Sequence, residues 1–291
     1  SLEMGGKRLR PVMLLLAYNL FSDEIDNALP AAVAIEVFHN FTLLHDDIMD
    51  GAKFRRNRPT VHMQFSENNA VLSGDVMAFL SYQYLMECKS ERLFDVAGLF
   101  TATAVEVCEG QQYDMDFEKR MDVTAGEYLG MIRLKTAVLL ACALKAGALL
   151  ANAADDVANR LYDFGLNLGM AFQLQDDLLD TFGDQQTFGK KIGGDILANK
   201  KTFLLIKALE TAPEKEQQEL KYWLTKKKFN QQEKIDGVTG IFRQNKIKEI
   251  TEEKINRYFH RSSELLNALP VNETKKNQLK ILGSQMLLRN N

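Results

Sequence analysis

The chain has 291 residues, which is long enough for one large domain or two modest ones with a substantial buried core. Hydrophobic residues make up 46% of it and charged residues 26%, and the formal net charge is only -3. This balance creates no global field that would attract nucleic acid or an anionic membrane surface. We therefore expect no nucleic-acid partner, and any binding of phosphate groups must be local.

Apolar residues recur at intervals of three and four along most of the chain, which is the pattern of helices with one buried face. The pattern predicts helices over residues 12–20, 31–44, 71–86, 93–113, 125–150 and 157–181. Alternating apolar residues and hairpin dipeptides, the signals of strands, are nearly absent. After Glu214 the sequence is rich in Lys, Glu and Gln, which indicates solvated helices that pack by one face. The sequence therefore predicts an all-α protein.

Three cysteines, Cys88, Cys108 and Cys142, lie singly in stretches with helical apolar spacing and form no CxxC pair. This usage predicts buried free thiols in a reducing compartment. No uncharged apolar run approaches the roughly 18 residues of a membrane span, and no secretory leader pattern opens the chain. We therefore expect a cytoplasmic protein without a membrane span.

The stretch FTLLHDDIMDGAKFRRNRPT, residues 41–60, places three aspartates beside three arginines. A helix that starts after Pro30 and ends near Asp50 puts Asp46 and Asp50 one turn apart on one face. Neighbouring Leu and Ile residues make this helix half buried, where uncompensated carboxylates are unfavourable. A salt-bridged surface helix is one interpretation. A magnesium site is the other, because Mg²⁺ prefers carboxylate oxygens and is commonly completed by substrate phosphates.

A second acidic triplet, in GMAFQLQDDLLDTFGD, repeats this spacing at Asp176, Asp177 and Asp180. Leu168 and Leu179 mark its helix as part of the core. The repeat favours the metal interpretation. Two half-buried DDxxD clusters that face each other would form a cleft able to hold several divalent ions around one diphosphate.

Basic residues gather in three further motifs. GGKRLRP contributes Lys7, Arg8 and Arg10, FRRNRP contributes Arg55, Arg56 and Arg58, and FGKKIGGDILANKK contributes Lys190, Lys191, Lys200 and Lys201. Guanidinium groups suit diphosphate oxygens in a bidentate geometry, and ammonium groups act as point charges. The GGK sequence is not a P-loop, because the GxxxxGK[ST] spacing and a preceding strand are both missing.

Together these motifs resemble those of the trans-isoprenyl diphosphate synthases, the polyprenyl synthetase family that includes farnesyl and geranylgeranyl diphosphate synthases. The resemblance covers nearly the whole chain and rests on GGKRLRP, a histidine seven residues before the first DDxxD, DDIMD, RRNRPT, EGQQYD, KT, FQLQDDLLD, GKKIGGD and NKKT, in that order. It implies one catalytic domain over residues 1–291, a large single-domain helical bundle around a central cavity with both acidic motifs at its mouth. It also implies a homodimer, and one or two helices ahead of GGKRLRP that are missing from this chain.

The resemblance assigns roles to individual residues. Three Mg²⁺ ions would be held by Asp46, Asp47, Asp50, Asp176, Asp177 and Asp180. The allylic diphosphate would be contacted by Arg55, Lys135, Lys190 and Lys200, with Lys191 as an alternative to Lys190. The diphosphate of isopentenyl diphosphate would be held by Lys7, Arg10, His39 and Arg56. Thr136 and Gln173 would flank the reacting carbons, with Gln111 and Asp114 beneath them. The residues expected to take part in catalysis are Asp46, Asp50, Asp176, Lys135, Thr136, Gln173 and Lys190.

The implied reaction is short-chain trans-prenyl transfer, in which isopentenyl diphosphate condenses with dimethylallyl, geranyl or farnesyl diphosphate. Metal-assisted ionisation of the allylic substrate would release its diphosphate. Phe41 and the small Thr42 precede the first motif as in archaeal-type geranylgeranyl synthases, which favours a twenty-carbon product over farnesyl diphosphate or a longer product. Phe41 could instead simply pack in the core.

Three other classes remain as alternatives. A terpene cyclase is expected to replace the second DDxxD, whereas this chain has DDLLD. A non-catalytic subunit of a heteromeric synthase is expected to lose one acidic motif, and both are intact. A di-iron bundle needs a pair of ExxH motifs, which the chain lacks.

Overall fold

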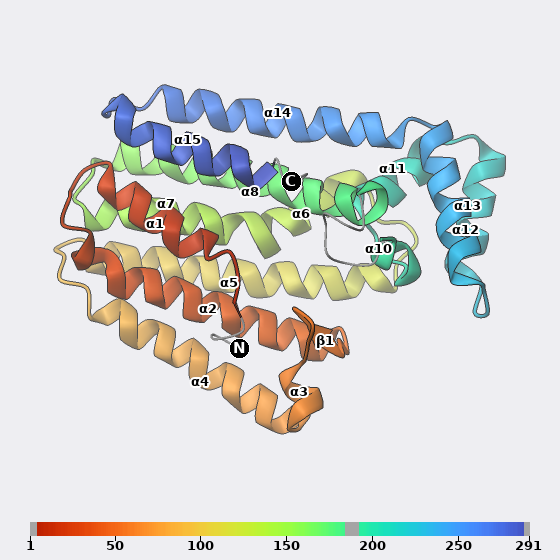
Figure 1. The fold of residues 1–291 in the computed structure, drawn as a ribbon, viewed down its shortest axis with the longest axis horizontal. Coiled ribbons are helices and arrows are strands. Elements are labelled where there is room, and N and C mark those ends of the chain that lie inside the picture. Colours follow the sequence, from red (N-terminus) through yellow and green to blue (C-terminus); the bar gives the residue numbers. More distant parts are fainter. Residues whose placement is uncertain (1–4, 184–191, 288–291) are drawn as a thin grey trace. The chain divides into compact units, whose positions relative to one another are not determined.

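The computed structural model describes residues 5–183 and 192–287, which form helices and one short hairpin (Figure 1). This confirms the predicted all-α class. Lys190 and Lys191 lie outside the described residues. Within the described ranges, no helix combines the length and the apolar character that crossing a bilayer requires.

The chain divides into two compact units. The first comprises residues up to 104 with 139–162 and 268–279, and the second comprises 105–138, 163–267 and the residues from 280 onward. Elements of the first unit are α1 (Leu9–Asn19), η2 (Ile25–Ala28), α2 (Leu29–Met49), β1 (Phe54–Arg55), β2 (Arg58–Pro59), α3 (Val61–Gln64) and α4 (Glu67–Met86). Elements of the second are α6 (Ala125–Ile132), η3 (Arg133–Ala137), α10 (Gly194–Leu197), α11 (Phe203–Thr211), α12 (Glu214–Thr225), α13 (Gln231–Gln244) and α14 (Ile247–Asn267). Both units receive parts of α5 (Leu93–Glu118), α7 (Val138–Leu150), α8 (Asp155–Phe182) and α15 (Glu273–Leu287).

Most predicted helices are present with slightly wider bounds, and α2 has the expected limits. It begins at Leu29, so that Pro30 falls in the first turn, where a proline is tolerated, and Asp50 caps its end. Residues 125–150 are helical throughout, as predicted, but the π-helical turn η3 between α6 and α7 was not predicted. The hairpin β1–β2 was not predicted either. Its turn residues Arg56 and Asn57 both have positive φ, at 52° and 60°.

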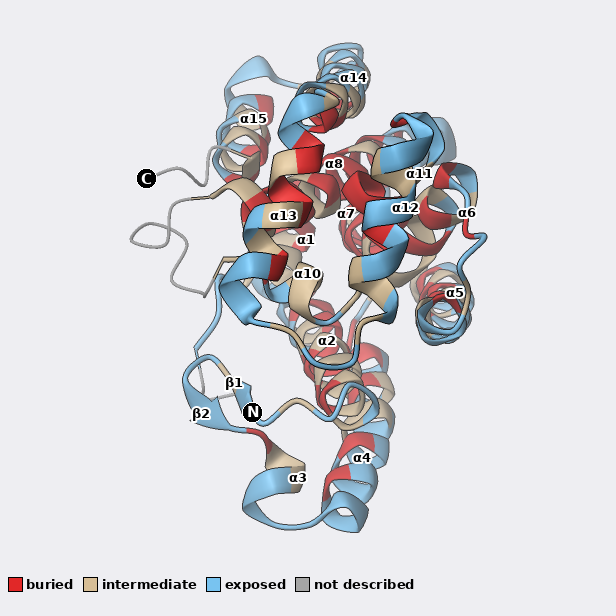
Figure 2. Ribbon diagram, turned by 90° about the vertical axis from the view of Figure 1, so that its right-hand side faces the viewer, coloured by how far each residue is buried: buried red, intermediate tan, exposed pale blue. Residues whose placement is uncertain are grey.

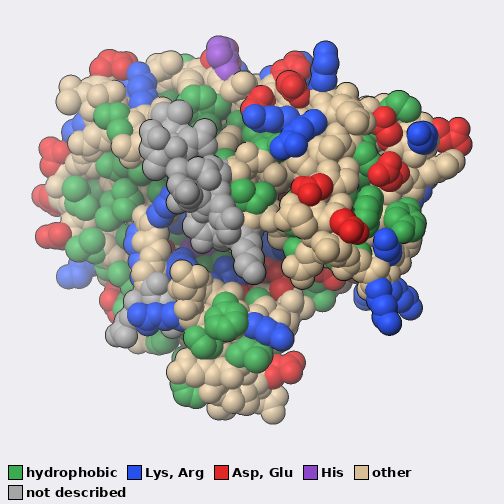
Figure 3. Space-filling model, turned by 45° about the vertical axis from the view of Figure 1, so that its right-hand side comes forward, with side chains coloured by type: hydrophobic (Ala, Val, Ile, Leu, Met, Phe, Trp, Pro, Cys, Tyr) green, Lys and Arg blue, Asp and Glu red, His purple; other side chains and the backbone are tan. Residues whose placement is uncertain are grey.

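In the first unit α2 packs against α1 and lies beside α4 (Figure 1). Most of α4 is exposed (Figure 2), and its buried residues are Ala70, Gly74, Ser81 and Leu85. Hydrophobic side chains also reach the surface in several places on the face that Figure 3 shows. In the second unit the buried apolar cluster draws on α6, α8, α11, α13 and α14.

The prediction of three buried thiols holds for Cys88 and Cys142 and was wrong for Cys108, which is exposed. Cys108 follows the buried Val107 on α5, and successive residues of an α-helix lie about 100° apart around its axis. One step along the helix therefore moves the side chain from the core to the surface.

Candidate active site

The first acidic motif occupies the last turn of α2 in the first unit. Asp47 is buried, Asp46 is partly buried and Asp50 is exposed at the end of the helix. Arg55 of β1 forks onto the first two, with Nε donating to Asp47 Oδ1 at 2.7 Å and Nη2 donating to Asp46 Oδ2 at 3.2 Å. Burial raises the pKa of Asp47, while the charge and the hydrogen bond of Arg55 oppose that rise. Arg55 thus supplies the compensating cation that two adjacent carboxylates need.

The hairpin determines how its arginines are presented. Pairing of β1 with β2 places Arg55 opposite Arg58, and the left-handed Arg56 and Asn57 make the tight turn between them. The side chain of Arg56 extends to the GGKRLRP motif, where its Nη1 donates to the carbonyl oxygen of Gly5. A side chain at Gly6 would meet this guanidinium group at 2.8 Å. The absence of a side chain at Gly6 therefore leaves room for the guanidinium group of Arg56.

His39 and Arg10 lie next to each other, with His39 Nε2 3.1 Å from Arg10 Nη1. Burial, followed by the positive charges of Arg10, Arg56, Arg55 and Arg8, holds the pKa of His39 well below its usual range. The imidazole is therefore neutral and accepts a hydrogen bond from Arg10. Three of the residues expected to hold isopentenyl diphosphate, Arg10, His39 and Arg56, are thus close enough to interact within one unit, and Lys7 is exposed in the same N-terminal segment.

A pocket adjoins the first acidic motif. Its lining residues are Asn40, Leu43, Leu44, Asp47, Arg55, Arg56, Thr60 and Val61. Phe41 is partly buried on the same helix, with its ring centroid 5.4 Å from that of Phe38 and 4.8 Å from that of His45. Thr42 donates its hydroxyl to the carbonyl oxygen of His39 at 2.9 Å. Both residues expected to affect chain length, Phe41 and Thr42, therefore contact other residues of α2.

The second acidic motif lies on α8 in the second unit, and its central residue, Asp177, is buried. Asp177 accepts hydrogen bonds from the Tyr128 hydroxyl and, at 3.0 Å, from Gln173 Nε2. Burial and then the charge of Asp195 raise the pKa of Asp177 to about 8, against those hydrogen bonds, and Asp176 adds to the rise. A carboxyl group so hard to ionise would be stabilised in its charged form by an added cation.

The motifs EGQQYD, KT and FQLQDD meet at η3 in this unit. Lys135 Nζ lies 2.6 Å from Asp114 Oδ2, and the Thr136 hydroxyl donates to Gln173 Oε1 at 3.0 Å. Gln111 has a buried amide nitrogen, Nε2, that makes no hydrogen bond within the described part of the chain. The structure therefore pairs four predicted site residues at η3, and Gln111 lies three residues before Asp114 on α5.

Two glycines explain this close meeting. A Cβ at Gly110 on α5 would lie 2.3 Å from the backbone nitrogen of Lys135, and one at Gly169 on α8 would lie 2.7 Å from the Cα of Ala137. Both helices therefore approach η3 at distances that only glycine allows. A π-helical turn often occurs at a functional site, and this one carries both Lys135 and Thr136.

The last basic motif, FGKKIGGDILANKK, contacts the second acidic motif through its residue Asp195. Asp180 accepts a hydrogen bond from the backbone nitrogen of Asp195 at 2.8 Å, and the backbone nitrogen of Lys200 donates to the carbonyl oxygen of Asp195 at 3.0 Å. Lys200 is thereby tied to the acidic motif. The expected contact at Lys190 lies outside the described residues and stays a prediction.

Sequence reasoning missed two groups at this site. Tyr128 lies on an apolar helix and gave no signal apart from its core position, whereas Asp195 was visible in GKKIGGD but received no role. Within the described residues, no group of three or more candidate side chains is gathered to hold one metal ion.

An all-α fold with two DDxxD motifs and basic side chains in each unit defines an isoprenoid synthase. A family model described as polyprenyl synthetase matches residues 1–241. The chain is 38% identical over 290 residues to the geranylgeranyl diphosphate synthase of Saccharolobus solfataricus, covering 98% of this chain and 87% of that protein. It is 44% identical to the one from Methanosarcina mazei, covering 72% of this chain and 65% of that protein. A crystal structure of geranylgeranyl pyrophosphate synthase matches with a TM-score of 0.94 at 42% identity, covering 100% of this chain and 90% of that one.

The chain therefore belongs to the polyprenyl synthetase family, and it is a prenyltransferase. The resemblance stated from the motifs is confirmed, as is the expected enzyme class.

The neutral state of His39 makes stability depend on pH. Because the folded pKa of His39 is lowered, the unfolded chain binds the proton more readily, and stability is lost as pH falls through about 6.5. We expect the free energy of unfolding to fall between pH 7.5 and 5.5 by roughly 1 kcal/mol more in the wild type than in His39→Gln. Urea unfolding at both pH values measures this. His260→Gln, at a side chain that is 77% exposed, serves as the control and should behave as the wild type. Equal pH dependence in the wild type and His39→Gln would contradict the assignment.

Proposed function

We propose that this prenyltransferase condenses isopentenyl diphosphate with dimethylallyl, geranyl or farnesyl diphosphate and forms geranylgeranyl diphosphate. The observation that carries the proposal is that two complete DDxxD motifs each lie beside side chains suited to diphosphate oxygens. Arg55 contacts the first motif, and Lys200 is tied to the second through Asp195. The names of the relatives from Saccharolobus solfataricus and Methanosarcina mazei support the product.

The acidic motifs suit Mg²⁺, because buried carboxyl groups with raised pKa gain most from a nearby cation. We propose that three ions are held by Asp46, Asp47, Asp50, Asp176, Asp177 and Asp180. Bound Mg²⁺ would neutralise the charge of the departing diphosphate and so assist ionisation of the allylic substrate. That the two motifs open onto one central cavity stays a prediction.

The basic side chains divide between the two substrates. Lys7, Arg10 and Arg56 would bind the diphosphate of isopentenyl diphosphate, and His39 would orient Arg10 through the hydrogen bond at its neutral ring. Arg55, Lys135 and Lys200 would bind the allylic diphosphate, together with Lys190. Guanidinium groups hold phosphate oxygens in pairs, which fixes the direction in which each substrate enters.

Thr136 and Gln173 would stabilise the allylic cation. The Thr136 hydroxyl donates its hydrogen to Gln173, so the oxygen of Thr136 keeps its electron pairs for positive charge. The double bond of isopentenyl diphosphate then attacks the cation, and the proton lost from the new chain passes to the released diphosphate. Buried apolar residues of α6 and α8 keep water from this part of the second unit.

The acidic motifs provide the first test of this mechanism. We expect Asp46→Asn and Asp176→Asn each to lower turnover by on the order of a hundredfold or more, because each removes a carboxylate that holds the metal. Incorporation of labelled isopentenyl diphosphate measures turnover, and circular dichroism checks the fold. Asp163→Asn, at an exposed position on α8, is the control and should keep full activity. Near wild-type turnover in EDTA, or in either variant, would exclude the mechanism.

Product length provides the second test. Phe41 lies five residues before Asp46, about 7.5 Å along the helix axis, so a growing prenyl tail that extends along α2 would meet it. We expect the wild type to release a twenty-carbon product and Phe41→Ala to release longer ones. Chromatography of the dephosphorylated products measures this. A folded, active Phe41→Ala enzyme with an unchanged product would assign Phe41 to the core instead.

We also propose that the enzyme acts as a homodimer. The outer face of α4 presents Leu72, Val76 and Phe79 at helical spacing, and Phe79 is 76% exposed. Phe94 at the start of α5 is 89% exposed in the same unit. An apolar stripe of this kind is typical of a protein interface, and the family resemblance supplies the partner, a second copy of this chain.

The stripe predicts the effect of a charge. We expect Phe79→Asp to convert the dimer to a monomer, because a buried carboxylate without a partner is unfavourable at an interface. Light scattering after size exclusion measures the mass. Tyr222→Asp, at a side chain that is 52% exposed on α12, is the matched control and should stay dimeric. A wild-type protein that elutes as a monomer, or a Phe79→Asp variant that remains a dimer, would contradict this proposal.

A further inference from the structure

The turn between α10 and α11 determines where Lys200 stands. Asn199, the residue before it, has a φ of 58°, in the left-handed region that asparagine tolerates better than most residues. On the other side, the Thr202 hydroxyl caps α11 by accepting from the backbone nitrogen of Leu205. The conformation of Asn199 therefore sets the direction in which the chain enters Lys200.

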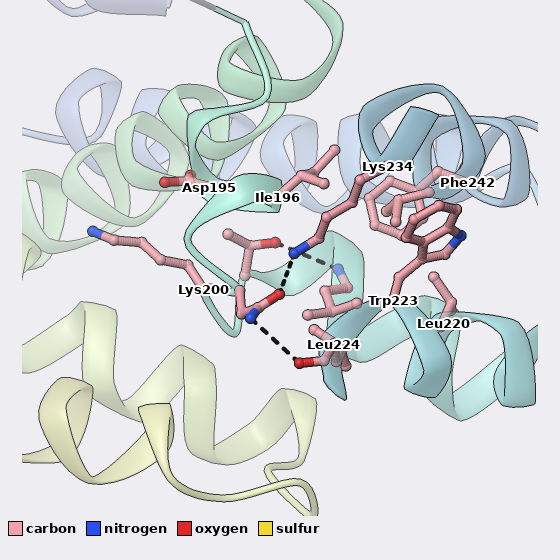
Figure 4. Close-up of a pocket in the computed structure, with 12 residues that line it drawn as sticks. Asp195, Ile196, Lys200, Leu220, Trp223, Leu224, Lys234 and Phe242 are labelled. Atoms are coloured by element: carbon pink, nitrogen blue, oxygen red, sulfur yellow. Dashed lines mark hydrogen bonds between the residues drawn. The ribbon is translucent and has the colours of Figure 1, made fainter. Parts of the chain in front are cut away.

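The side chain of Asn199 is held at both ends (Figure 4). Its Oδ1 accepts a hydrogen bond from Lys234 Nζ at 2.5 Å, and its Nδ2 donates to the carbonyl oxygen of Leu224 at 3.3 Å. Its backbone carbonyl oxygen accepts from Lys201 Nζ, also at 3.3 Å. These contacts reach Asn199 from α12, from α13 and from the turn itself.

Lys234 is the unusual member of this group, because it is only 1% exposed. Within the described residues it forms no ion pair, and its ammonium group meets the Asn199 amide and, at 4.4 Å, the ring of Phe229. Burial, with the charge of Lys201, lowers the pKa of Lys234. Burying an ammonium group against a neutral acceptor is unfavourable compared with burying an apolar side chain of similar length. Stability alone therefore does not account for a lysine at this position.

The backbone that carries Lys234 is itself well fixed. Asn230 caps α13 by accepting from the backbone nitrogens of Gln232 and Glu233 at 2.9 and 3.3 Å. One residue beyond Lys234, the side chain of Ile235 packs so closely on Gly193 that a Cβ there would lie 2.8 Å away. The first turn of α13 is thus docked beside α10, and Lys234 extends from it to Asn199.

Lys200 leaves the turn on the side away from Lys234 (Figure 4). The carboxylate of Asp195 points to that same side, and its charge is one cause of the raised pKa of Asp177. The side chain of Lys200 therefore extends toward the acidic part of the second unit. Lys234 contacts the turn from the opposite side, through Asn199.

We propose that Lys234 is a positioning residue, whose buried ammonium group fixes the Asn199 amide and thereby aims Lys200 at the diphosphate of the allylic substrate. Lys234 itself touches no substrate. The inference rests on the proposed function in one respect, the contact between Lys200 and that diphosphate.

The test compares Lys234→Met with a matched variant, Lys276→Met. Lys276 is 2% exposed in the other unit and donates to the carbonyl oxygen of Leu269 at 3.0 Å, so it controls for the removal of a buried lysine. We expect Lys234→Met to raise the KM for the allylic diphosphate about tenfold and to change that for isopentenyl diphosphate less than twofold. Lys276→Met should change neither. Equal rises for both substrates, or the same rise in Lys276→Met, would overturn the proposal.

A double variant separates positioning from general damage. In a Lys200→Ala background, Lys234→Met should add no further rise in the KM for the allylic diphosphate, because the side chain that it aims is gone. A full tenfold rise in that background would overturn the proposal. Asn199→Gly keeps the left-handed backbone and removes the amide. It should therefore raise the KM for the allylic diphosphate about tenfold as well, and it provides the test if Lys234→Met folds poorly.

Hydrogen exchange provides a readout that does not depend on the substrate. We expect peptides that cover residues 194–203 to exchange faster in Lys234→Met than in the wild type and in Lys276→Met. Unchanged exchange would overturn the proposal whatever the kinetics. If Lys200→Ala leaves the KM for the allylic diphosphate unchanged, the proposed substrate contact fails, and the exchange result still decides whether Lys234 holds the turn.

Discussion

Each unit of this protein contains a buried aspartate, and the groups that stabilise it differ between the two units. Asp47 receives a formal positive charge from Arg55, whereas Asp177 receives the neutral donors Tyr128 and Gln173 and lies near the charge of Asp195. Arg55 compensates the first motif from within the protein. At Asp177 itself, burial and the charges of Asp195 and Asp176 raise the pKa, so a cation bound there would favour the ionised form.

The helical framework and both acidic motifs could be predicted because they depend on local patterns. Apolar spacing fixes which face of α2 and α8 is buried, and the DDxxD spacing then decides which carboxylates share a face. The turn η3 and the hairpin could not be predicted in this way. The first depends on how closely Gly110 and Gly169 let other helices approach, and the second on two residues, Arg56 and Asn57, that adopt positive φ without a glycine.

Other site residues were hidden because their chemistry comes from distant partners. Tyr128 lies 49 positions before Asp177, and Lys234 lies 35 positions after Asn199. Each sits in a helix whose local sequence has an ordinary interpretation, an apolar core helix for Tyr128 and a solvated amphipathic helix for Lys234. The expectation that the region after Glu214 merely packs by one face is true of most of α13. It misses the buried lysine of this helix, Lys234.

Close backbone contact and buried charge act together in the second unit. Gly110 and Gly169 bring η3 against α5 and α8, which places Lys135 on Asp114 and Thr136 on Gln173. Because Gln173 also donates to Asp177, the hydroxyl of Thr136 is linked to the second acidic motif through one amide. The amide can accept from Thr136 only through its oxygen and donate to Asp177 only through its nitrogen, so its orientation is fixed. A change in the charge of Asp177 would therefore be felt at the hydroxyl that is proposed to face the reacting carbon.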